Sequence, residues 1–338
     1  MISKNKKNIF RGEKAIFDYL TPGAMGSTPI IELPSRLNPF LKDKVHIYLK
    51  LAHNVPLTNI KSLSAWYMLN ALSDSELKKI KNLVEYSSGN TVMSLAILSR
   101  HFGIPNMHAI ITPDVPKNKQ NLLKLLGVDL IVSDGPRSPD VHGKVGGIWD
   151  AMQMGKQSGW KNLNQYVNKN SPKASGEIIG KELWEQLGDK INILCVSLGT
   201  GGTVVGLGSY LRNKISDLCL IAMSIKSGSS IPGPRGEDAV KKLDFPWEEM
   251  TNLELPVAEK PAFEMSLKLI REGIFVGPST GMQLAGILEV LKEVKKEKKL
   301  SRFHNKDKEI NVVLVACDTM FPYIEDYFTV LSDELINK

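Results

Sequence analysis

The stretch Ile191-Asn-Ile-Leu-Cys-Val-Ser-Leu-Gly-Thr-Gly-Gly-Thr203 decides the fold that this sequence predicts. Residues 191–197 form a short, mostly apolar run of the length of a buried strand, and the glycine-rich turn after them leads into a helical pattern that ends at Leu211. Such a turn gathers several backbone N–H groups and the positive end of the helix dipole around one point. Thr200 and Thr203 can add hydroxyl donors. The stretch therefore predicts a phosphate site, although a glycine-rich turn can also join a strand to a helix without any ligand.

Two familiar nucleotide sites are not predicted at this turn. A P-loop ends in Gly-Lys-Ser/Thr, and no lysine is present here. A dinucleotide site requires a third glycine, where Val204 stands, and an acid after the next strand, where Lys226 stands. We therefore expect a smaller phosphorylated ligand than NAD.

Size and charge limit the class of protein. At 338 residues the chain is long enough for two domains, and its formal net charge is +7. Basic residues gather in the first dozen positions and in residues 292–299, where acids alternate with them, and no basic stripe is interleaved with aromatics. Nucleic-acid binding is therefore not expected. No apolar run has the length of a membrane span or of the core of a signal peptide, so no membrane association is expected.

The cysteines and histidines indicate neither disulfides nor a metal. Cys195, Cys219 and Cys317 lie far apart in apolar runs, and the six histidines are scattered singly. We expect buried, reduced thiols, a cytoplasmic protein and no metal site.

Expected strands and helices alternate along the chain. The expected strands cover residues 45–51, 83–86, 107–111, 128–132, 191–197, 218–225 and 310–317. The expected helices cover residues 61–70, 92–102, 116–126, 146–157, 174–186, 261–271 and 282–296, and residues 226–255 read mainly as loop. Alternation of this kind predicts an α/β fold with parallel sheets and right-handed crossovers.

Three turns rich in glycine and hydroxyl side chains are expected to follow strands, at residues 87–91, 199–203 and 277–281. Ligands of open α/β sheets bind at the carboxyl ends of the strands, so the three turns would face one cleft. Each turn taken alone is equally well explained as a helix cap. Taken together they predict a ligand site.

On these motifs the sequence resembles the fold-type II pyridoxal-phosphate (PLP) enzymes, in the cysteine synthase and cystathionine β-synthase branch. Ser88-Gly-Asn-Thr91 is similar to the substrate loop of that family, Gly199-Thr-Gly-Gly-Thr203 to its phosphate loop, and Gly277-Pro-Ser-Thr-Gly281 to the turn at the pyridine nitrogen. Gln165-Tyr-Val-Asn168 is similar to its Gln-Phe-x-Asn segment, and Lys50-Leu51 to the start of its lysine segment. The resemblance covers residues 27 to about 317.

The resemblance implies a tryptophan synthase β-like fold of two doubly wound α/β domains with the active site in the cleft between them. Residues 55–160 would form the smaller domain with the substrate loop. Residues 12–54 and 161–338 would form the larger domain, which binds the cofactor phosphate, and residues 1–11 a basic tail.

The resemblance also implies the roles of single residues. Lys61 would carry the cofactor covalently and act as the general base at the substrate Cα. The other implied cofactor contacts are Gly199, Thr200, Gly201, Gly202 and Thr203 at the phosphate, Asn90 at the ring hydroxyl and Ser279 at the ring nitrogen. The implied contacts to the amino-acid substrate are Ser87, Ser88, Gly89, Thr91 and Gln165. An aspartate at position 279 would keep the nitrogen protonated, whereas a neutral serine favours loss of a β-substituent.

Two segments differ from the family pattern. The family's lysine segment usually runs Glu-x-x-Asn-Pro-x-Gly-Ser-x-Lys-Asp-Arg, and its positions before and after Lys61 are here Ala52, Val55, Pro56, Thr58, Asn59, Ser62 and Leu63. The family's C-terminal Pro-Asp/Ser-x-Gly element reads Ala316-Cys-Asp-Thr319. These differences concern the reaction and the substrate more than the cofactor.

The implied function is PLP-dependent β-replacement on O-acetylserine or O-phosphoserine with sulfide or another nucleophile, giving cysteine or a related β-substituted alanine. Arg235, in Ile231-Pro-Gly-Pro-Arg-Gly236, is similar to an arginine of phosphoserine-using relatives; a surface arginine bonded to Glu237 or Asp238 explains it equally well. The sequence is also compatible with cystathionine or diaminopropionate synthesis, with serine or cysteine elimination, and with a paralogue that binds a ligand without turnover. The implied partners are a second copy of the chain and, in some members, the C-terminal tail of serine acetyltransferase.

Overall fold

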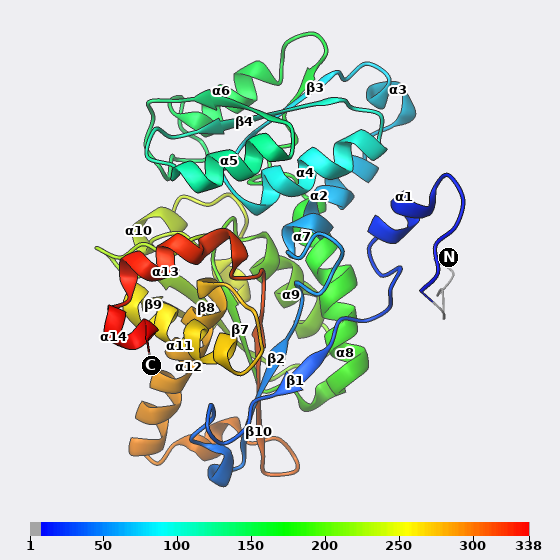
Figure 1. Cartoon of the computed structure of the whole chain (residues 1–338). Helices are drawn as coiled ribbons and strands as arrows, with labels where there is room; N and C mark the ends of the chain where they lie inside the picture. Colours follow the sequence, from blue (N-terminus) through cyan, green and yellow to red (C-terminus); the bar gives the residue numbers. More distant parts are fainter. Residues whose placement is uncertain (1–7, 338) are drawn as a thin grey trace.

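The computed structural model describes residues 8–337 of the chain, so most of the predicted basic tail at residues 1–11 lies outside it (Figure 1). The strands of this part are β1 (Ile30–Glu32), β2 (Val45–Lys50), β3 (Asn82–Tyr86), β4 (Asn106–Ile111), β5 (Val128–Val132), β6 (Trp160–Lys161), β7 (Ile193–Ser197), β8 (Cys219–Ile225), β9 (Leu253–Val257) and β10 (Ile310–Val315). They form two separate sheets, one above the other in Figure 1.

Helices surround both sheets. They are α1 (Ala15–Leu20), α2 (Lys61–Asn70), α3 (Asp74–Leu77), α4 (Asn90–His101), α5 (Lys117–Leu125), α6 (Gly147–Met154), α7 (Asn170–Ala174), the π-helix η2 (Ser175–Gly180), α8 (Lys181–Leu187), α9 (Gly202–Arg212), α10 (Glu237–Val240), α11 (Glu259–Arg271), α12 (Pro278–Lys296), α13 (Ile324–Val330) and α14 (Asp333–Ile336). Within residues 8–337, no helix combines the length and the apolar character that a membrane span requires.

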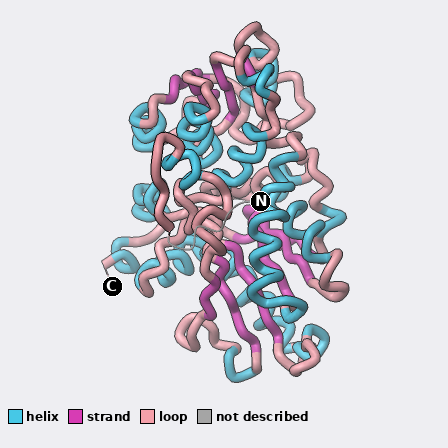
Figure 2. The backbone as a smooth tube through the Cα atoms, turned by 90° about the vertical axis from the view of Figure 1, so that its right-hand side faces the viewer, coloured by secondary structure: helices cyan, strands magenta, loops and turns pink. Residues whose placement is uncertain are grey.

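The larger sheet has the order β1-β2-β10-β7-β8-β9, and all its neighbours are parallel except β1 and β2 (Figure 2). Every residue of β10 is buried, which is typical of a parallel strand covered by helices on both faces. One side of this sheet packs against α11 and α12, through residues such as Ala262 and Ile287, and the other against α9, through Val204 and Leu207.

The smaller sheet has the order β5-β4-β3-β6 and is entirely parallel. Successive side chains of a strand point to opposite faces. Leu83 of β3 accordingly packs in one apolar cluster with Leu95 of α4, whereas its neighbour Val84 packs in another with Ile148 of α6. Helices thus cover both faces of this sheet, and the α/β fold with two parallel sheets agrees with the sequence prediction. The domain boundaries at residues 55 and 160 stay predictions.

Two sequence predictions about strands are wrong. The strand expected just before Gly277 does not form, because the N–H groups of Gly273 and Ile274 donate to carbonyls in the last turn of α11 and that of Val276 donates to the carbonyl of Ile274. The helix α12 begins at Pro278 instead of Met282, so residues 277–281 are its first turn. Conversely, β9 was not expected, since residues 226–255 read mainly as loop. Pro256 is tolerated in β9 because this is the edge strand of the sheet.

Candidate active site

A cavity of about 610 Å³ lies between the two sheets, a size typical of sites for small organic ligands. A smaller cavity continues from it and shares Lys61, Asn90 and Gly199 with it. The residues singled out in the sequence that line these two cavities are Lys61, Ser87, Ser88, Gly89, Asn90, Thr91, Gln165, Gly199, Thr200, Gly201, Thr203, Arg235 and Ser279. The predicted residue that lines neither cavity is Gly202, whose Cα faces Ser171, since a Cβ there would lie 3.1 Å from the Ser171 Oγ.

The turn after β7 has the geometry of an anion site. Gly201 has a φ of +86°, which favours glycine, and α9 begins directly after it. The first N–H groups of a helix have no partner within the helix, so such groups can bind a ligand in a cavity. In α9 the N–H of Gly202 donates weakly to the hydroxyl of Thr200, at 3.4 Å. The segment that contains Arg235 covers the turn, because the Arg235 N–H donates to the Leu198 carbonyl at 2.7 Å. This donor set fits the phosphate of a small cofactor.

Lys61 is the first residue of α2 and is held from two sides. The N–H of Ile60 donates to the Cys317 carbonyl at 2.7 Å, and Asn59 forms a β-bridge with Asp318. Burial lowers the pKa of Lys61, and its electrostatic interactions with the side chains of Cys317 and Asp318 oppose this effect. A lowered pKa increases the neutral fraction of the amine, which is the form that can attack a carbonyl group or accept a proton.

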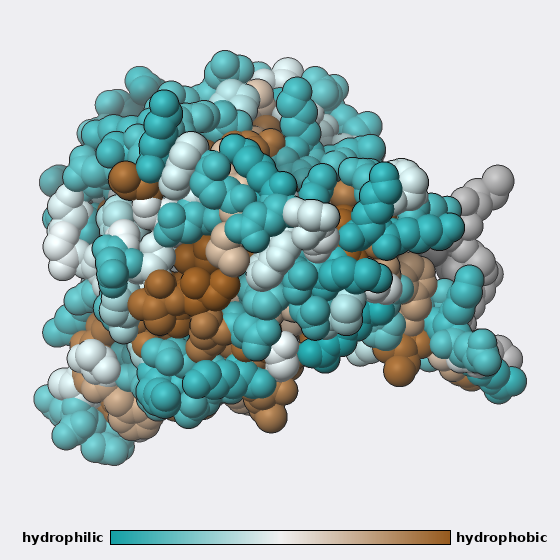
Figure 3. Space-filling model, turned by 90° about the horizontal axis from the view of Figure 1, so that it is seen from above, coloured by the Kyte–Doolittle hydropathy of each residue, from teal (hydrophilic) through white to brown (hydrophobic). Residues whose placement is uncertain are grey.

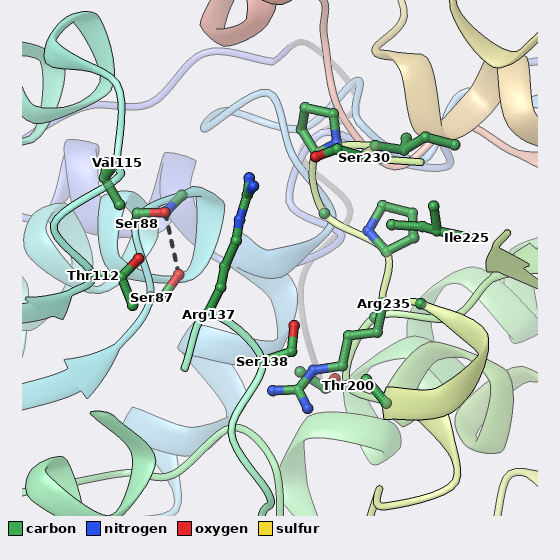
Figure 4. A pocket seen from close by; sticks show the side chains of 18 of the residues that line it. Ser87, Ser88, Thr112, Val115, Arg137, Ser138, Thr200, Ile225, Ser230 and Arg235 are labelled. Carbon is green, nitrogen blue, oxygen red and sulfur yellow. Dashed lines mark hydrogen bonds between the residues drawn. The ribbon is translucent and has the colours of Figure 1, made fainter. Parts of the chain in front are cut away.

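The loop at residues 87–91 joins β3 to α4 at the cavity. The hydroxyl of Ser87 accepts the N–H of Gly89 at 3.2 Å, and the hydroxyl of Thr91 donates to Oε1 of Gln165 at 2.6 Å. The N-terminal residue of α4 is capped by no side chain, so the helix-cap explanation of these hydroxyl groups does not hold. Ser87 and Ser88 lie at one wall of the cavity (Figure 4).

Glu85 lies behind this loop and was not singled out in the sequence. Its side chain is 1% exposed, and it accepts the N–H of Tyr86 at 3.2 Å and the amide of Asn162 at 3.4 Å. Burial raises the pKa of Glu85 from 4.5 to about 7, and its hydrogen-bond donors, among them the backbone of Gln165, only partly oppose the rise. The carboxyl group thus connects the loop to the segment that carries Gln165.

Replacing Glu85 with glutamine is expected to change how stability depends on pH. Because the pKa rises on folding, from 4.5 to about 7, the protonated carboxyl group stabilises the fold fully below pH 4.5 and loses that contribution as the pH rises to 7. The loss amounts to roughly 3 kcal/mol. Urea unfolding between pH 4.5 and 8 should therefore show the wild type losing stability relative to Glu85→Gln. The matched control is Glu289→Gln, in an exposed residue of α12; equal pH profiles for wild type and Glu85→Gln would contradict the assignment.

Asp318 and Tyr323 are further cavity residues that sequence reasoning missed. Oδ2 of Asp318 accepts the amide of Asn90 at 2.7 Å and the hydroxyl of Tyr323 at 2.6 Å. Oδ1 accepts the hydroxyl of Ser279 at 3.5 Å. Burial raises the pKa of Asp318, while these three donors and the charge of Lys61 oppose the rise. Asp318 was visible in the sequence only as part of an altered family element, and no local pattern marks Tyr323.

Arg235 is buried, with 7% of its surface exposed, and its guanidinium lies over the ring of Tyr166 at 4.9 Å. Its Nη1 donates to the carbonyl of Pro139 at 3.3 Å. Glu237 instead accepts the N–H of Ser227, and Asp238 pairs with Lys241. Arg235 is therefore not a surface arginine bonded to either of these acids.

A second arginine reaches the same cavity. Arg137 and Arg235 both extend into the space between Ser87 and Thr112 on one side and Ile225 and Ser230 on the other (Figure 4). Arg137 has a side chain that is 63% exposed and lies 3.9 Å from Asp114, and its backbone carbonyl accepts the hydroxyl of Tyr86 at 2.6 Å. The mouth of the cavity thus carries two guanidinium groups that differ in burial.

Comparisons with known proteins agree on one family. The family model described as "Pyridoxal-phosphate dependent enzyme" matches residues 22–303. The chain is 28% identical over 270 residues to cysteine synthase B of Escherichia coli, covering 79% of this chain and 86% of that protein. It is 26% identical over 286 residues to a cysteine synthase of Staphylococcus aureus, covering 81% and 89%.

The solved structure of a cysteine synthase from Entamoeba histolytica matches the fold with a TM-score of 0.77 at 23% identity, over 100% of this chain and 98% of that one. The matched family model spans the lysine at the start of α2, the turn at the start of α9 and the first turn of α12. The residues that line the cavity fit pyridoxal phosphate, the cofactor in the family's description. The chain belongs to the pyridoxal-phosphate dependent enzyme family.

Proposed function

We propose that this protein replaces the β-substituent of an activated serine, O-acetylserine or O-phosphoserine, with sulfide or a similar nucleophile. The observation that carries the proposal is the meeting in one cavity of Lys61, which has a lowered pKa, with the hydroxyl loop at residues 87–91 and the helix start of α9. Relatives named cysteine synthase support the same reaction. Pyridoxal phosphate, when bound, supplies an electron sink that makes the substrate Cα–H acidic and eases loss of the β-substituent.

Three groups of residues in this chain would have different roles in the reaction. The first turn of α9 and the hydroxyls of Thr200 and Thr203 would hold the cofactor phosphate. Thr91 and Gln165, which already share a hydrogen bond of 2.6 Å, would bind the substrate carboxylate. Lys61 would carry the cofactor and move the Cα proton, for which a lowered pKa suits it.

The reaction is tested by adding substrates to the purified protein reconstituted with pyridoxal phosphate. We expect the visible absorbance of the bound cofactor to shift when O-acetylserine or O-phosphoserine is added, and cysteine to form once sulfide follows. The alternative reactions, which are cystathionine synthesis, diaminopropionate synthesis and elimination, are tested in the same assay. Their substrates are homocysteine, precursors of 2,3-diaminopropionate, serine and cysteine. An absorbance that responds to no amino acid would contradict the enzymatic proposal and favour a paralogue that only binds a ligand.

We further propose that the leaving group is anionic. Arg235 is buried beside the cavity, where its guanidinium contacts the carbonyl of Pro139 and the side chain of Tyr166, and no carboxylate within residues 8–337 is paired with it. A buried cation of this kind is stabilised by an anion. A guanidinium matches a phosphate group with two parallel hydrogen bonds. O-phosphoserine is therefore the preferred donor.

Arg235→Ala is expected to lower kcat/KM for O-phosphoserine while changing that for O-acetylserine little. Loss of one charge-assisted contact costs about 1.5–3 kcal/mol, or about 10- to 100-fold in kcat/KM. Steady-state kinetics with both donors measure this ratio. Arg137→Ala is the matched control, because it removes the same charge from an exposed position of the same cavity. Equal losses for both donors, or none, would reject an anionic leaving group.

We also propose that the protein acts as a homodimer in cytoplasmic cysteine biosynthesis, and that a serine acetyltransferase tail can enter the cavity. Analytical ultracentrifugation tests the first point. Binding of the tail is tested by titrating the protein with a peptide of an acetyltransferase C-terminus while the absorbance of the bound cofactor is recorded.

A further inference from the structure

Three tyrosines line the larger cavity, Tyr86, Tyr166 and Tyr323, and their hydroxyl groups differ in what they contact. The hydroxyl of Tyr86 donates to the backbone carbonyl of Arg137 at 2.6 Å, and that of Tyr323 donates to the carboxyl group of Asp318 at 2.6 Å. The hydroxyl of Tyr166 has no carbonyl or carboxyl acceptor within residues 8–337. Among these three tyrosines of the described chain, Tyr166 is thus the one whose hydroxyl proton is left for a ligand.

Tyr166 lies in the turn between β6 and α7, and its side chain contacts that of Arg235. The guanidinium carbon is 4.9 Å from the centre of the Tyr166 ring, and a side-chain hydrogen bond joins the two groups. A guanidinium can only donate, so the phenol oxygen accepts this bond and its own proton stays free. Burial raises the pKa of Tyr166, and the charge of Arg235 only partly opposes the rise, so the hydroxyl remains a donor at neutral pH.

The guanidinium of Arg235 is held in place before any ligand binds. The backbone N–H of Arg235 donates to the carbonyl of Leu198 at 2.7 Å, and its Nη1 donates to the carbonyl of Pro139 at 3.3 Å. The Arg235 and Tyr166 residues are each 7% exposed. Side chains that are already ordered lose little conformational freedom when a ligand binds. A charged donor and a neutral donor are therefore fixed side by side at the cavity.

The position of this pair distinguishes its ligand from the phosphate of the cofactor. Both residues line the larger cavity, and neither lines the smaller one, which contains the turn at residues 199–203. Tyr166 directly follows Gln165, to which the proposed function gives the substrate carboxylate. Consecutive Cα atoms are only about 3.8 Å apart, so one small amino acid can reach both residues. Its β-substituent is the group that would meet Tyr166 and Arg235.

The acidic groups nearby do not oppose an anion at this point. Glu85, whose carboxyl group acts on the pKa of Tyr166, lines neither cavity. Each acidic side chain that does line the larger cavity has a partner of its own; the pairs are Asp114 with Arg137, Asp238 with Lys241, and Glu237 with the N–H of Ser227.

We propose that Tyr166 is a specificity-determining residue, which together with Arg235 forms a two-donor subsite for the anionic leaving group of the substrate. The guanidinium of Arg235 and the hydroxyl of Tyr166 would donate to oxygens of the same phosphate group. This inference rests on the proposed function, which puts an amino acid with a β-substituent in the cavity. The neutral acetyl group of O-acetylserine gains less from such donors, because hydrogen bonds to a charged acceptor are about twice as strong.

Tyr166→Phe tests the subsite by kinetics, since it keeps the ring beneath the guanidinium and removes only the hydroxyl. We expect kcat/KM for O-phosphoserine to fall at least about 10-fold, and that for O-acetylserine to change less than about 2-fold. Tyr86→Phe is the matched control, because the proton of that hydroxyl is already donated to a backbone carbonyl, and it should leave the ratio of the two donors unchanged. Equal losses for both donors in Tyr166→Phe would reveal a merely structural role and overturn the proposal.

The double variant Tyr166→Phe/Arg235→Ala shows whether the two residues bind the same group. Residues that share one partner are coupled, so the double variant should lose clearly less kcat/KM for O-phosphoserine than the product of the two single losses. A loss equal to that product would mean that the residues act on different groups, which contradicts a shared subsite.

Binding of the phosphonate analogue of O-phosphoserine, in which a methylene group replaces the bridging oxygen, tests the subsite without turnover. Calorimetric titration of the holoenzyme should give a Kd that rises at least about 10-fold in Tyr166→Phe. The Kd of α-aminobutyrate, which lacks the phosphonate, should stay the same. An unchanged Kd of the phosphonate would overturn the subsite, whereas a Tyr166-dependent Kd in a protein that replaces no β-substituent would refute the proposed function alone.

Discussion

Replacing Lys61 with alanine is expected to abolish turnover while the protein stays folded. Lys61 combines a place at the start of α2, a side chain that lines both cavities and a pKa lowered by burial. Loss of a general base alone typically costs about 10²–10⁴-fold, and loss of the residue that carries the cofactor adds to it. Because the buried amine costs desolvation energy, the free energy of unfolding should not decrease. Steady-state kinetics and urea unfolding measure the two effects.

The same assignment can be checked in the wild type. Borohydride reduction fixes the cofactor to the lysine that carries it, and peptide mapping should find the label on Lys61. Lys119→Ala is the matched control, because Lys119 lines the same cavity but pairs with Asp326, and it should leave the label in place. A label on any other lysine would refute the role of Lys61.

Gly281→Ala is expected to have the largest effect on stability among glycine substitutions near the site. A Cβ at Gly281 would lie 2.0 Å from the carbonyl oxygen of Ala262 and 2.4 Å from the nitrogen of Ser266, both in the backbone of α11. Neither can move without displacing the whole helix, so α11 and α12 must separate. We expect the free energy of unfolding to decrease by an amount at the upper end of the ~1–3 kcal/mol range for overpacked cores. In the interior of an isolated helix, by contrast, replacing glycine with alanine stabilises the helix.

Gly286→Ala, in the same helix, is the matched control. Its Cβ would meet the flexible end of Met223 at 2.9 Å, which can rotate away, so its effect should be smaller. Urea unfolding compares the two variants, and the cofactor absorbance of Gly281→Ala should also change because Ser279 lies in the same turn of α12. Equal stability of Gly281→Ala and the wild type would show that the two helices are not packed this closely.

Three phenylalanines contribute to an apolar surface near α13. Phe321 and Phe275 stack edge to face at 6.0 Å, and both are more than half exposed, as is Phe328 on α13. Figure 3 shows the molecule from above, and hydrophobic residues gather there on its left side. This is the side on which α13 lies in Figure 1. These rings thus remain open to solvent in the single chain.

Local sequence determined the strand–turn–helix units of this protein. The apolar run of β7 and the glycines after it predicted the start of α9, and the helical spacing after Lys61 predicted α2 from Lys61 to Asn70. Backbone sterics and the period of apolar residues act over a few residues, so such units can be predicted from the sequence alone. The expected strand before Gly277 failed for a related reason: a short apolar run fits a strand or a tight connection equally well.

Only the tertiary structure decided how charged groups meet. Asp318 lies 39 positions from Ser279 and 228 from Asn90, yet one carboxyl group binds both, and Arg235 becomes buried against Pro139 across 96 positions. In the sequence, Glu85 is likewise only a polar residue in an apolar strand. Its environment is decided by the segment that carries Gln165, which packs over it. The burial and the partners of such groups, and therefore their pKa values and their chemistry, depend on contacts between distant segments. Those contacts arise only when the two sheets and their helices pack together, and no local pattern of residues encodes them.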